Sequence, residues 1–261
     1  MKTEKVSEFI IDWLKNYAKK NKISGFVVGI SGGIDSAVTS TLCAKTGLDV
    51  LCLEMPIKQN NEHVSRAKNH IKNLESNYNN VSGKLVDLNS VFDSFCNEVN
   101  SSQKGSTNEL SLANSRARLR MTTLYYFAGI NNYLVAGTGN KVEDFGVGFY
   151  TKYGDGGVDL SPIADLLKSE VFKLGHFLQV DESIINAKPS DGLYADSRSD
   201  EDQIGATYDE LEWAMRVEDS NSKNSIRERE VLEIYNSFNS SNKHKMDPIP
   251  ICKIPNDLLK N

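Results

Sequence analysis

The sequence has few cysteines and no long apolar stretch. Its four cysteines are scattered over 261 residues without a CxxC pair, which argues against a disulfide framework and against a thiolate zinc site. No run of roughly 18 apolar residues occurs, and the N-terminus has no apolar core of the signal-peptide kind. We therefore expect a cytoplasmic protein whose thiols are reduced and mostly buried.

A surplus of basic residues is also missing. Thirty-five aspartates and glutamates outnumber the 30 lysines and arginines, so the formal net charge is -5. General binding to nucleic acid or to an anionic membrane needs spare cations that replace phosphate counterions, so we expect neither partner. The hydrophobic fraction of 39% is enough for a sizeable core, and we expect residues 1–261 to form a single domain.

Short β-type runs alternate with helix-patterned stretches along the chain. The β-type runs are residues 26–30, 50–54, 84–88 and 133–137. Helical patterns, with apolar residues at three- and four-residue steps, cover residues 3–20, 108–130, 203–218 and 225–238. This alternation predicts an α/β fold, a doubly wound and mostly parallel sheet flanked by helices.

The segment FVVGISGGIDS, residues 26–36, joins a β-type run to a helix through a glycine-rich turn. Glycines let successive N–H groups converge on an anion at the positive end of the next helix. The candidate phosphate-binding residues are Gly29, Ile30, Ser31, Gly32, Gly33, Ile34, Asp35 and Ser36. Because no lysine follows the glycines as in the Walker loop GxxxxGK[ST], a different phosphate chemistry is indicated.

Other interpretations of this loop remain open. Residues 29–33 also satisfy GxSxG, the nucleophile elbow of serine hydrolases, with Ser31 as nucleophile and His176 or His244 as base. Such an elbow normally follows several strands, whereas only one helical segment precedes this one. A purely structural turn, or a nucleotide-binding module without catalysis, would also contain such a loop.

Two later segments are predicted to be binding loops. Seven of the 18 glycines lie between residues 137 and 157, and a second irregular stretch covers residues 188–202. Long segments without regular structure inside a compact domain are usually functional. We expect both loops to close over a bound nucleotide.

The spelling SGGIDS resembles the loop of the PP-loop superfamily, the N-type ATP pyrophosphatases, which cleave ATP between the α- and β-phosphates and adenylate a substrate oxygen. Within it, the rest of the chain resembles the ammonia-dependent NAD synthetase family. The matching motifs are residues 114–121 (NSRARLRM), 137–143 (GTGNKVE), 151–159 (TKYGDGGVD), 167–168 (LK), 189–190 (PS), 199–201 (SDE), 207–210 (TYDE) and 244–245 (HK). The resemblance implies the adenine nucleotide α-hydrolase-like form of a Rossmann-like fold.

The resemblance also implies the reaction, which is the last step of NAD biosynthesis. ATP activates the carboxylate of deamido-NAD as an acyl-adenylate, ammonia then forms the amide, and AMP and pyrophosphate are released. About 25 residues precede the loop strand, too few for a glutaminase domain, so free ammonia is the expected nitrogen source. The family forms homodimers. Another adenylating PP-loop ligase is the alternative within the superfamily.

Site residues follow from the same resemblance, position by position. The expected Mg²⁺ ligands are Asp35 and Glu143, and the ATP contacts beyond the loop are Thr138, Lys168 and Ser190. The expected deamido-NAD contacts are Arg118, Lys152, Asp159, His244 and Lys245. Ser190 stands where threonine is usual, and Met246 stands where an arginine usually follows His244 and Lys245.

Catalytic roles are expected for Asp35, Lys168 and Asp155. Asp155 is a hypothesis drawn from its acidic side chain beside the expected substrate contacts, where it would steer ammonium and help to deprotonate it. His63 and His70 share one helix face, but no acidic or cysteine ligands complete a metal site there. We expect both histidines to lie on the surface.

Overall fold

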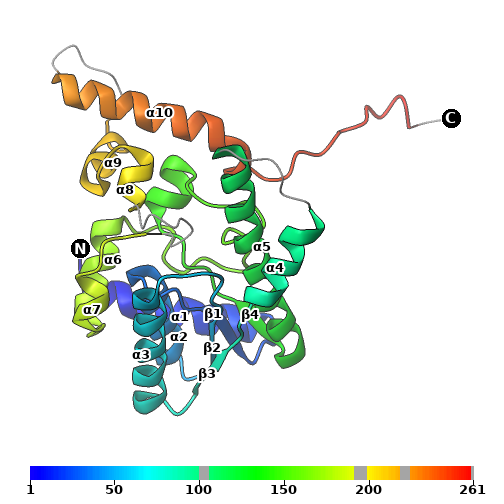
Figure 1. Ribbon diagram of the computed structural model, residues 1–261, viewed down its shortest axis with the longest axis vertical. Coiled ribbons are helices and arrows are strands. Elements are labelled where there is room, and N and C mark those ends of the chain that lie inside the picture. Colours follow the sequence, from blue (N-terminus) through cyan, green and yellow to red (C-terminus); the bar gives the residue numbers. More distant parts are fainter. Residues whose placement is uncertain (100–105, 191–198, 218–223, 260–261) are drawn as a thin grey trace.

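A parallel four-stranded sheet forms the centre of the computed structural model, which describes residues 1–99, 106–190, 199–217 and 224–259 (Figure 1). The strands are β1 (Gly25–Gly29), β2 (Asp49–Glu54), β3 (Val81–Leu85) and β4 (Tyr133–Val135). Their order is β3-β2-β1-β4, and every pairing is parallel. The order reverses at β1, and ligands bind at such a switch point, at the carboxyl ends of the strands.

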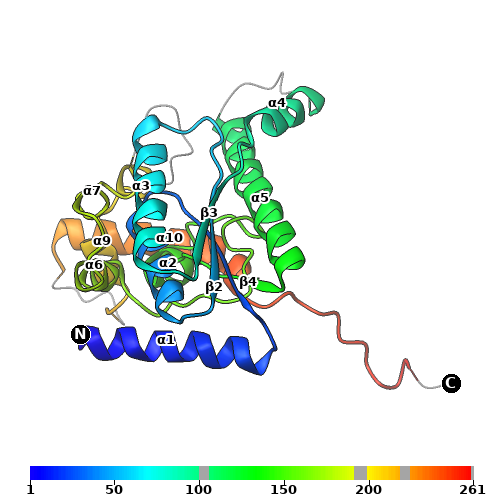
Figure 2. The same cartoon turned by 90° about the horizontal axis from the view of Figure 1, so that it is seen from below.

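Helices cover both faces of the sheet, which confirms the predicted doubly wound α/β class (Figure 2). The helices of the first half are α1 (Thr3–Lys20), α2 (Ile34–Lys45), α3 (Asn61–Asn77), α4 (Asn89–Glu98) and α5 (Ser106–Asn131). Side chains alternate along β1, so that Phe26 and Val28 pack with α1, α2 and α3 while Val27 packs with α4 and α5.

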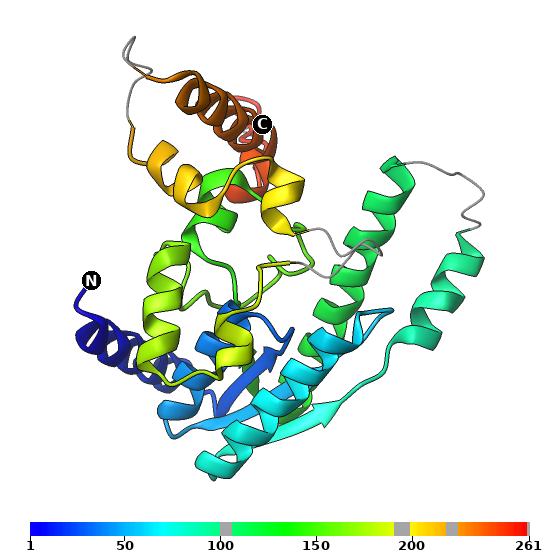
Figure 3. The same cartoon turned by 60° about the vertical axis from the view of Figure 1, so that its left-hand side comes forward.

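A second group of helices lies over the carboxyl end of the sheet (Figure 3). It comprises the π-helix η1 (Val142–Val147), α8 (Asp200–Ile204), α9 (Tyr208–Ala214) and α10 (Ile226–Met246). The helices α6 (Lys168–Phe177) and α7 (Glu182–Ile185) instead pack with α1 and α2 on one face of the sheet. A separate apolar cluster joins η1, α8, α9 and α10, with Val142, Leu211 and Val231 at its centre. The carboxyl ends of the strands therefore lie between the sheet with its flanking helices and this second apolar cluster.

Several predicted boundaries are wrong in detail. The expected helix over residues 203–218 is two helices, because Gly205 ends α8 with a φ of 87° and Thr207 caps the start of α9. The expected strand over residues 84–88 begins earlier, at Val81, which pairs with Val50. Only the first three residues of 133–137 form a strand, and Ala136 continues it by a single bridge to Leu160.

The expectations from composition are met in part. Cys43 and Cys52 are buried free thiols, and burial raises the pKa of Cys52 to about 12. Cys96 is half-buried and Cys252 is exposed, so burial holds for only two of the four thiols. Within the described ranges, no helix is both long and apolar enough to cross a bilayer.

His70 is buried, contrary to the expectation of a surface position. Its Nε2 lies 2.9 Å from Ser40 Oγ in α2. Because the Ser40 hydroxyl donates to the Ser36 carbonyl at 2.7 Å, its oxygen accepts from the Nε2–H of a neutral imidazole. Burial lowers the pKa of His70 to about 4, against a partial opposing effect of Asp181. His63 is half-buried and lines the cavity described below.

The buried imidazole predicts acid-dependent stability. The pKa of His70 is about 4 in the folded protein and 6.5 in the reference state, so the unfolded chain binds the proton first. The contribution of His70 to the free energy of unfolding is therefore fully present above pH 6.5 and decreases as the pH drops towards 4. At pH 5 the loss is about 2 kcal/mol. Urea titrations from pH 7.5 to 5 should show this slope in wild type and lose it in His70→Gln.

His176→Gln provides the matched control, because His176 is exposed on α6. This variant should retain the wild-type pH dependence. An unchanged slope in His70→Gln would show that other groups cause the acid sensitivity.

Candidate active site

A cavity of about 680 Å³ opens at the carboxyl ends of β1 and β4. Its walls come from the β1–α2 loop, the middle of α5, the segment after β4, the start of α6 and the end of α10. The cavity thus lies at the topological switch point, between the neighbouring strands β1 and β4.

The glycine-rich loop is held in shape by its own hydroxyl groups. Ser31 N donates to Ser36 Oγ at 3.2 Å, and Gly33 N donates to Ser31 Oγ at 3.2 Å. Gly32 has a φ of 83°, and a Cβ there would meet the His63 carbonyl oxygen at 2.5 Å, so only glycine fits. The loop therefore presents the N-terminus of α2 to the cavity, where an anion is favoured.

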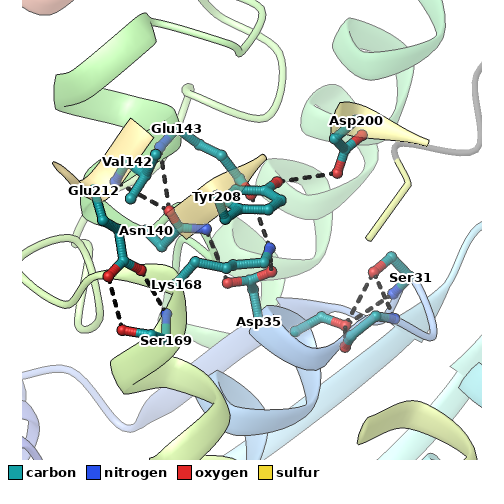
Figure 4. A network of polar contacts seen from close by, with 12 residues as sticks. Ser31, Asp35, Asn140, Val142, Glu143, Lys168, Ser169, Asp200, Tyr208 and Glu212 are labelled. Carbon is teal, nitrogen blue, oxygen red and sulfur yellow. Dashed lines mark hydrogen bonds and ion pairs between the residues drawn. The ribbon is translucent and has the colours of Figure 1, made fainter. Parts of the chain in front are cut away.

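A lysine and two carboxylates meet beside this loop (Figure 4). Lys168 Nζ donates to Asp35 Oδ2 at 2.6 Å and to Glu143 Oε1 at 2.8 Å, and the lysine side chain is only 3% exposed. Asn140 Nδ2 donates to Asp35 Oδ1 at 3.0 Å, while Asn140 Oδ1 accepts from the Val142 and Glu143 amides. The cluster joins α2, η1 and α6.

One ammonium group cannot fully neutralise two buried carboxylates, so their pKa values are pushed apart. Burial and the charge of Glu143 raise the pKa of Asp35, although Lys168 opposes this. Burial acts in the same direction on Glu143, but Lys168 and the hydroxyl of Tyr208 outweigh it and lower the pKa. Burial alone would lower the pKa of Lys168, whereas the two carboxylates raise it, so the lysine is charged.

A cationic wall lies across the cavity and draws on three separated segments. Arg118 donates to the Lys152 carbonyl at 3.3 Å, and Lys152 Nζ donates to the His244 carbonyl at 2.7 Å. Lys245 Nζ donates to the Tyr150 carbonyl at 2.7 Å. Arg118, Lys152, His244 and Lys245, which the resemblance assigns to deamido-NAD, all line the cavity. The positive charge of the arginine and the two lysines suits a ligand that carries phosphate and carboxylate groups.

Asp159 is the expected substrate contact that the structure places elsewhere. It is absent from the cavity lining. Its carboxylate accepts from Tyr125 Oη at 3.0 Å and from the Val135 amide at 2.8 Å, so it fixes the end of β4. Gly32 also lies outside the lining, since it faces α3.

Asp155, Thr138 and Ser190 line the cavity. Asp155 Oδ1 accepts from the Thr151 amide at 2.9 Å. Burial raises the pKa of Asp155, and the charge of Glu143 adds to this while the Thr151 amide and Lys245 oppose it. Part of the expected closing loop, residues 191–198, lies outside the described residues.

Three side chains of the site were missed from the sequence. Tyr208 Oη donates to Glu143 Oε1 at 2.6 Å, and Glu212 accepts from Ser169 N and Oγ at 2.8 Å each. Asn140 links the two carboxylate-bearing segments. Tyr208 and Asn140 stand inside the motifs TYDE and GTGNKVE, so those motifs were the available signal.

Asp35 and Glu143 suit a hard cation, although they form a small ligand set. Among the described residues, no cluster of three or more His, Cys, Asp or Glu side chains could hold a metal. Mg²⁺ is commonly bound through one or two carboxylates together with water and substrate phosphates. The donor set therefore fits magnesium that arrives with a nucleotide.

Fold and cavity together define a doubly wound α/β protein with an anion-binding loop and a carboxylate–lysine cluster in one site. The chain belongs to the NAD synthase family, whose model matches residues 6–248. This match confirms the resemblance seen in the sequence.

Individual relatives extend over most of the chain. The NH(3)-dependent NAD(+) synthetase of Carboxydothermus hydrogenoformans is 39% identical over 80% of this chain and 84% of its own length. That of Syntrophomonas wolfei is 35% identical over 99% of both. The solved structure of NMN synthetase from Francisella tularensis superposes with a TM-score of 0.85 at 31% identity, covering 98% of this chain and 99% of that one.

The buried cluster predicts a large cost for removing its cation. Lys168→Met retains most of the stem but leaves Asp35 and Glu143 unpaired, so the free energy of unfolding should fall by about 3–5 kcal/mol. Lys141→Met is the control, because its partner Asp165 is 96% exposed, and exposed pairs contribute less than about 1 kcal/mol. Urea denaturation at neutral pH measures both. Equal losses would contradict the cluster as described.

Proposed function

We propose that the protein catalyses the ATP-dependent amidation of deamido-NAD with free ammonia, giving NAD, AMP and pyrophosphate. The observation that carries this proposal is the pairing of Lys168 with Asp35 and Glu143 beside the anion-binding loop. Membership of the NAD synthase family supports the product, and the NH(3)-dependent relatives support the nitrogen source.

The chemistry needs activation because a carboxylate oxygen is a poor leaving group. Attack of the substrate carboxylate on the α-phosphorus forms the acyl-adenylate and releases pyrophosphate. Ammonia then attacks the carbonyl carbon, loses a proton, and displaces AMP. Both steps concentrate negative charge, so the protein acts mainly by positioning and by electrostatic stabilisation.

Each group of residues has a place in this scheme. The loop amides and the N-terminus of α2 would hold phosphates, and Lys168 would turn from its carboxylates to the nucleotide. Asp35 and Glu143 would hold Mg²⁺, which neutralises phosphate charge when bound. Arg118, Lys152, His244 and Lys245 would receive the dinucleotide.

Asp155 is the proposed acceptor of the ammonium proton. It lines the cavity, and burial raises its pKa, which brings a carboxylate closer to the working pH of a base. Asp155→Asn should therefore slow amide formation at least 10-fold more than pyrophosphate release. Rapid-quench measurements of NAD and pyrophosphate separate the two. An equal effect on both products would remove this role.

A single domain and a homodimer complete the proposal. The apolar clusters on the two faces of the sheet both contribute residues to the lining of one cavity, which supports a single domain. Tyr126 and Ile130, on the outer side of α5, are 63% and 61% exposed. Exposed large apolar side chains of this kind support an interface between copies of the chain.

A mononucleotide substrate is the second candidate, because the solved structure of an NMN synthetase superposes over nearly the whole chain. A hydrolase receives no support. Ser31 Oγ bonds to Ser36 Oγ and Gly33 N, and His244, one of the two candidate bases, bonds through Nδ1 to the Ser241 carbonyl instead.

Incubation of the purified protein with ATP, Mg²⁺ and an ammonium salt tests the reaction. We expect deamido-NAD to be converted into NAD with equal amounts of AMP, and glutamine to replace ammonium poorly. A parallel tube with nicotinic acid mononucleotide measures the second candidate. Chromatography of the nucleotides reports all products. Turnover with glutamine as sole nitrogen source would contradict the ammonia preference, and AMP without amide would indicate another acceptor.

A further inference from the structure

We propose that Tyr208 is a positioning residue that holds Glu143 in its working orientation, a role that rests on the proposed metal site. The hydroxyl of Tyr208 lies 2.6 Å from Glu143 Oε1 and 3.2 Å from Asp200 Oδ2. Both Tyr208 and Asp200 are 6% exposed. The phenol therefore reaches Glu143 from α9 (Figure 4).

The phenol is a permanent donor. A phenol carries one proton, and the shorter distance assigns it to Glu143 rather than to Asp200. The ordinary pKa of a phenol is about 10, so the hydroxyl is protonated at neutral pH. Glu143 is thereby always supplied with one hydrogen bond from Tyr208.

Lys168 and Tyr208 donate to the same oxygen of Glu143. The distances are 2.8 Å from Lys168 Nζ and 2.6 Å from Tyr208 Oη. In the proposed reaction Lys168 turns to the nucleotide phosphates, which removes its bond to Glu143. The bond from Tyr208 then remains to fix the carboxylate, and such partners of metal-binding groups orient them.

Hydrogen bonds at both ends of α9 fix the position of Tyr208. Thr207 and Glu210 form a capping box at its start, which fixes the first turn. Glu212, one turn after Tyr208, accepts from both Ser169 N and Ser169 Oγ at 2.8 Å. Because Ser169 follows Lys168, one face of α9 supports the backbone beside the lysine as well as the side chain of Glu143.

The ring of Tyr208 contributes separately from its hydroxyl. Lys168 Nζ lies 4.8 Å from the ring centroid, within the range of a cation–π contact. Tyr208→Phe retains this contact and the packing of the ring while removing only the donor. The substitution therefore separates the hydroxyl, with its short bond to Glu143 and its longer contact to Asp200, from the ring.

The test is a titration with Mn²⁺, followed by electron paramagnetic resonance, in the presence of a non-hydrolysable ATP analogue. We expect Tyr208→Phe to bind Mn²⁺ about 10-fold more weakly than wild type. Tyr235→Phe is the matched control, since Tyr235 packs half-buried against the same apolar cluster, and its Mn²⁺ affinity should be unchanged. The KM for deamido-NAD should change little in either variant, while kcat falls in Tyr208→Phe.

Three further outcomes are decisive. Wild-type Mn²⁺ affinity in Tyr208→Phe, with or without a lower Tm, would reduce Tyr208 to a structural role. Absence of Mn²⁺ binding in wild type would overturn the metal site and this inference together. Replacement of Tyr208 by p-aminophenylalanine restores an N–H donor and should recover the Mn²⁺ affinity. If Tyr208→Phe does not fold, the p-aminophenylalanine variant carries the test. Failure of that variant, once folded, to bind Mn²⁺ would overturn the positioning role of Tyr208.

Discussion

The ammonium group of Lys168, shared between Asp35 and Glu143, is the interaction on which the site depends. It joins three segments that are far apart in the chain, since Lys168 lies 133 residues from Asp35 and 25 from Glu143. Burying one cation with two carboxylates costs desolvation energy that their attraction barely recovers. A simpler apolar core would serve stability as well, so stability alone does not explain the arrangement.

The sheet topology makes this meeting possible. Asp35 follows β1, whereas Glu143 follows β4, the neighbour of β1 on the other side of the switch point. Lys168 opens α6, and its N-terminal position brings the ammonium group back over the sheet. The second layer of helices then closes the cluster from above through Tyr208. The cluster therefore lies where the helices packed on the sheet meet the second group of helices.

The sequence predicted what depends on neighbours in the chain and missed what depends on packing. Helix 3–20 and the loop with Asp35 follow from local periodicity and turn chemistry. The bond from Asn140 to Asp35 spans 105 residues, so no local pattern marks it. His70 shows the same limit. Its spacing from His63 placed both histidines on one helix face, but the spacing does not reveal that α2 packs over His70.

In the proposed site, electrostatics would couple the binding of magnesium to that of ATP. If a divalent ion replaced the Lys168 ammonium without a nucleotide, two positive charges would remain near each other in a poorly hydrated site. Phosphate oxygens remove this conflict, because they attract both the lysine and the metal. Magnesium and ATP should therefore bind cooperatively, with Glu143 held in place by Tyr208 while its cationic partner is exchanged.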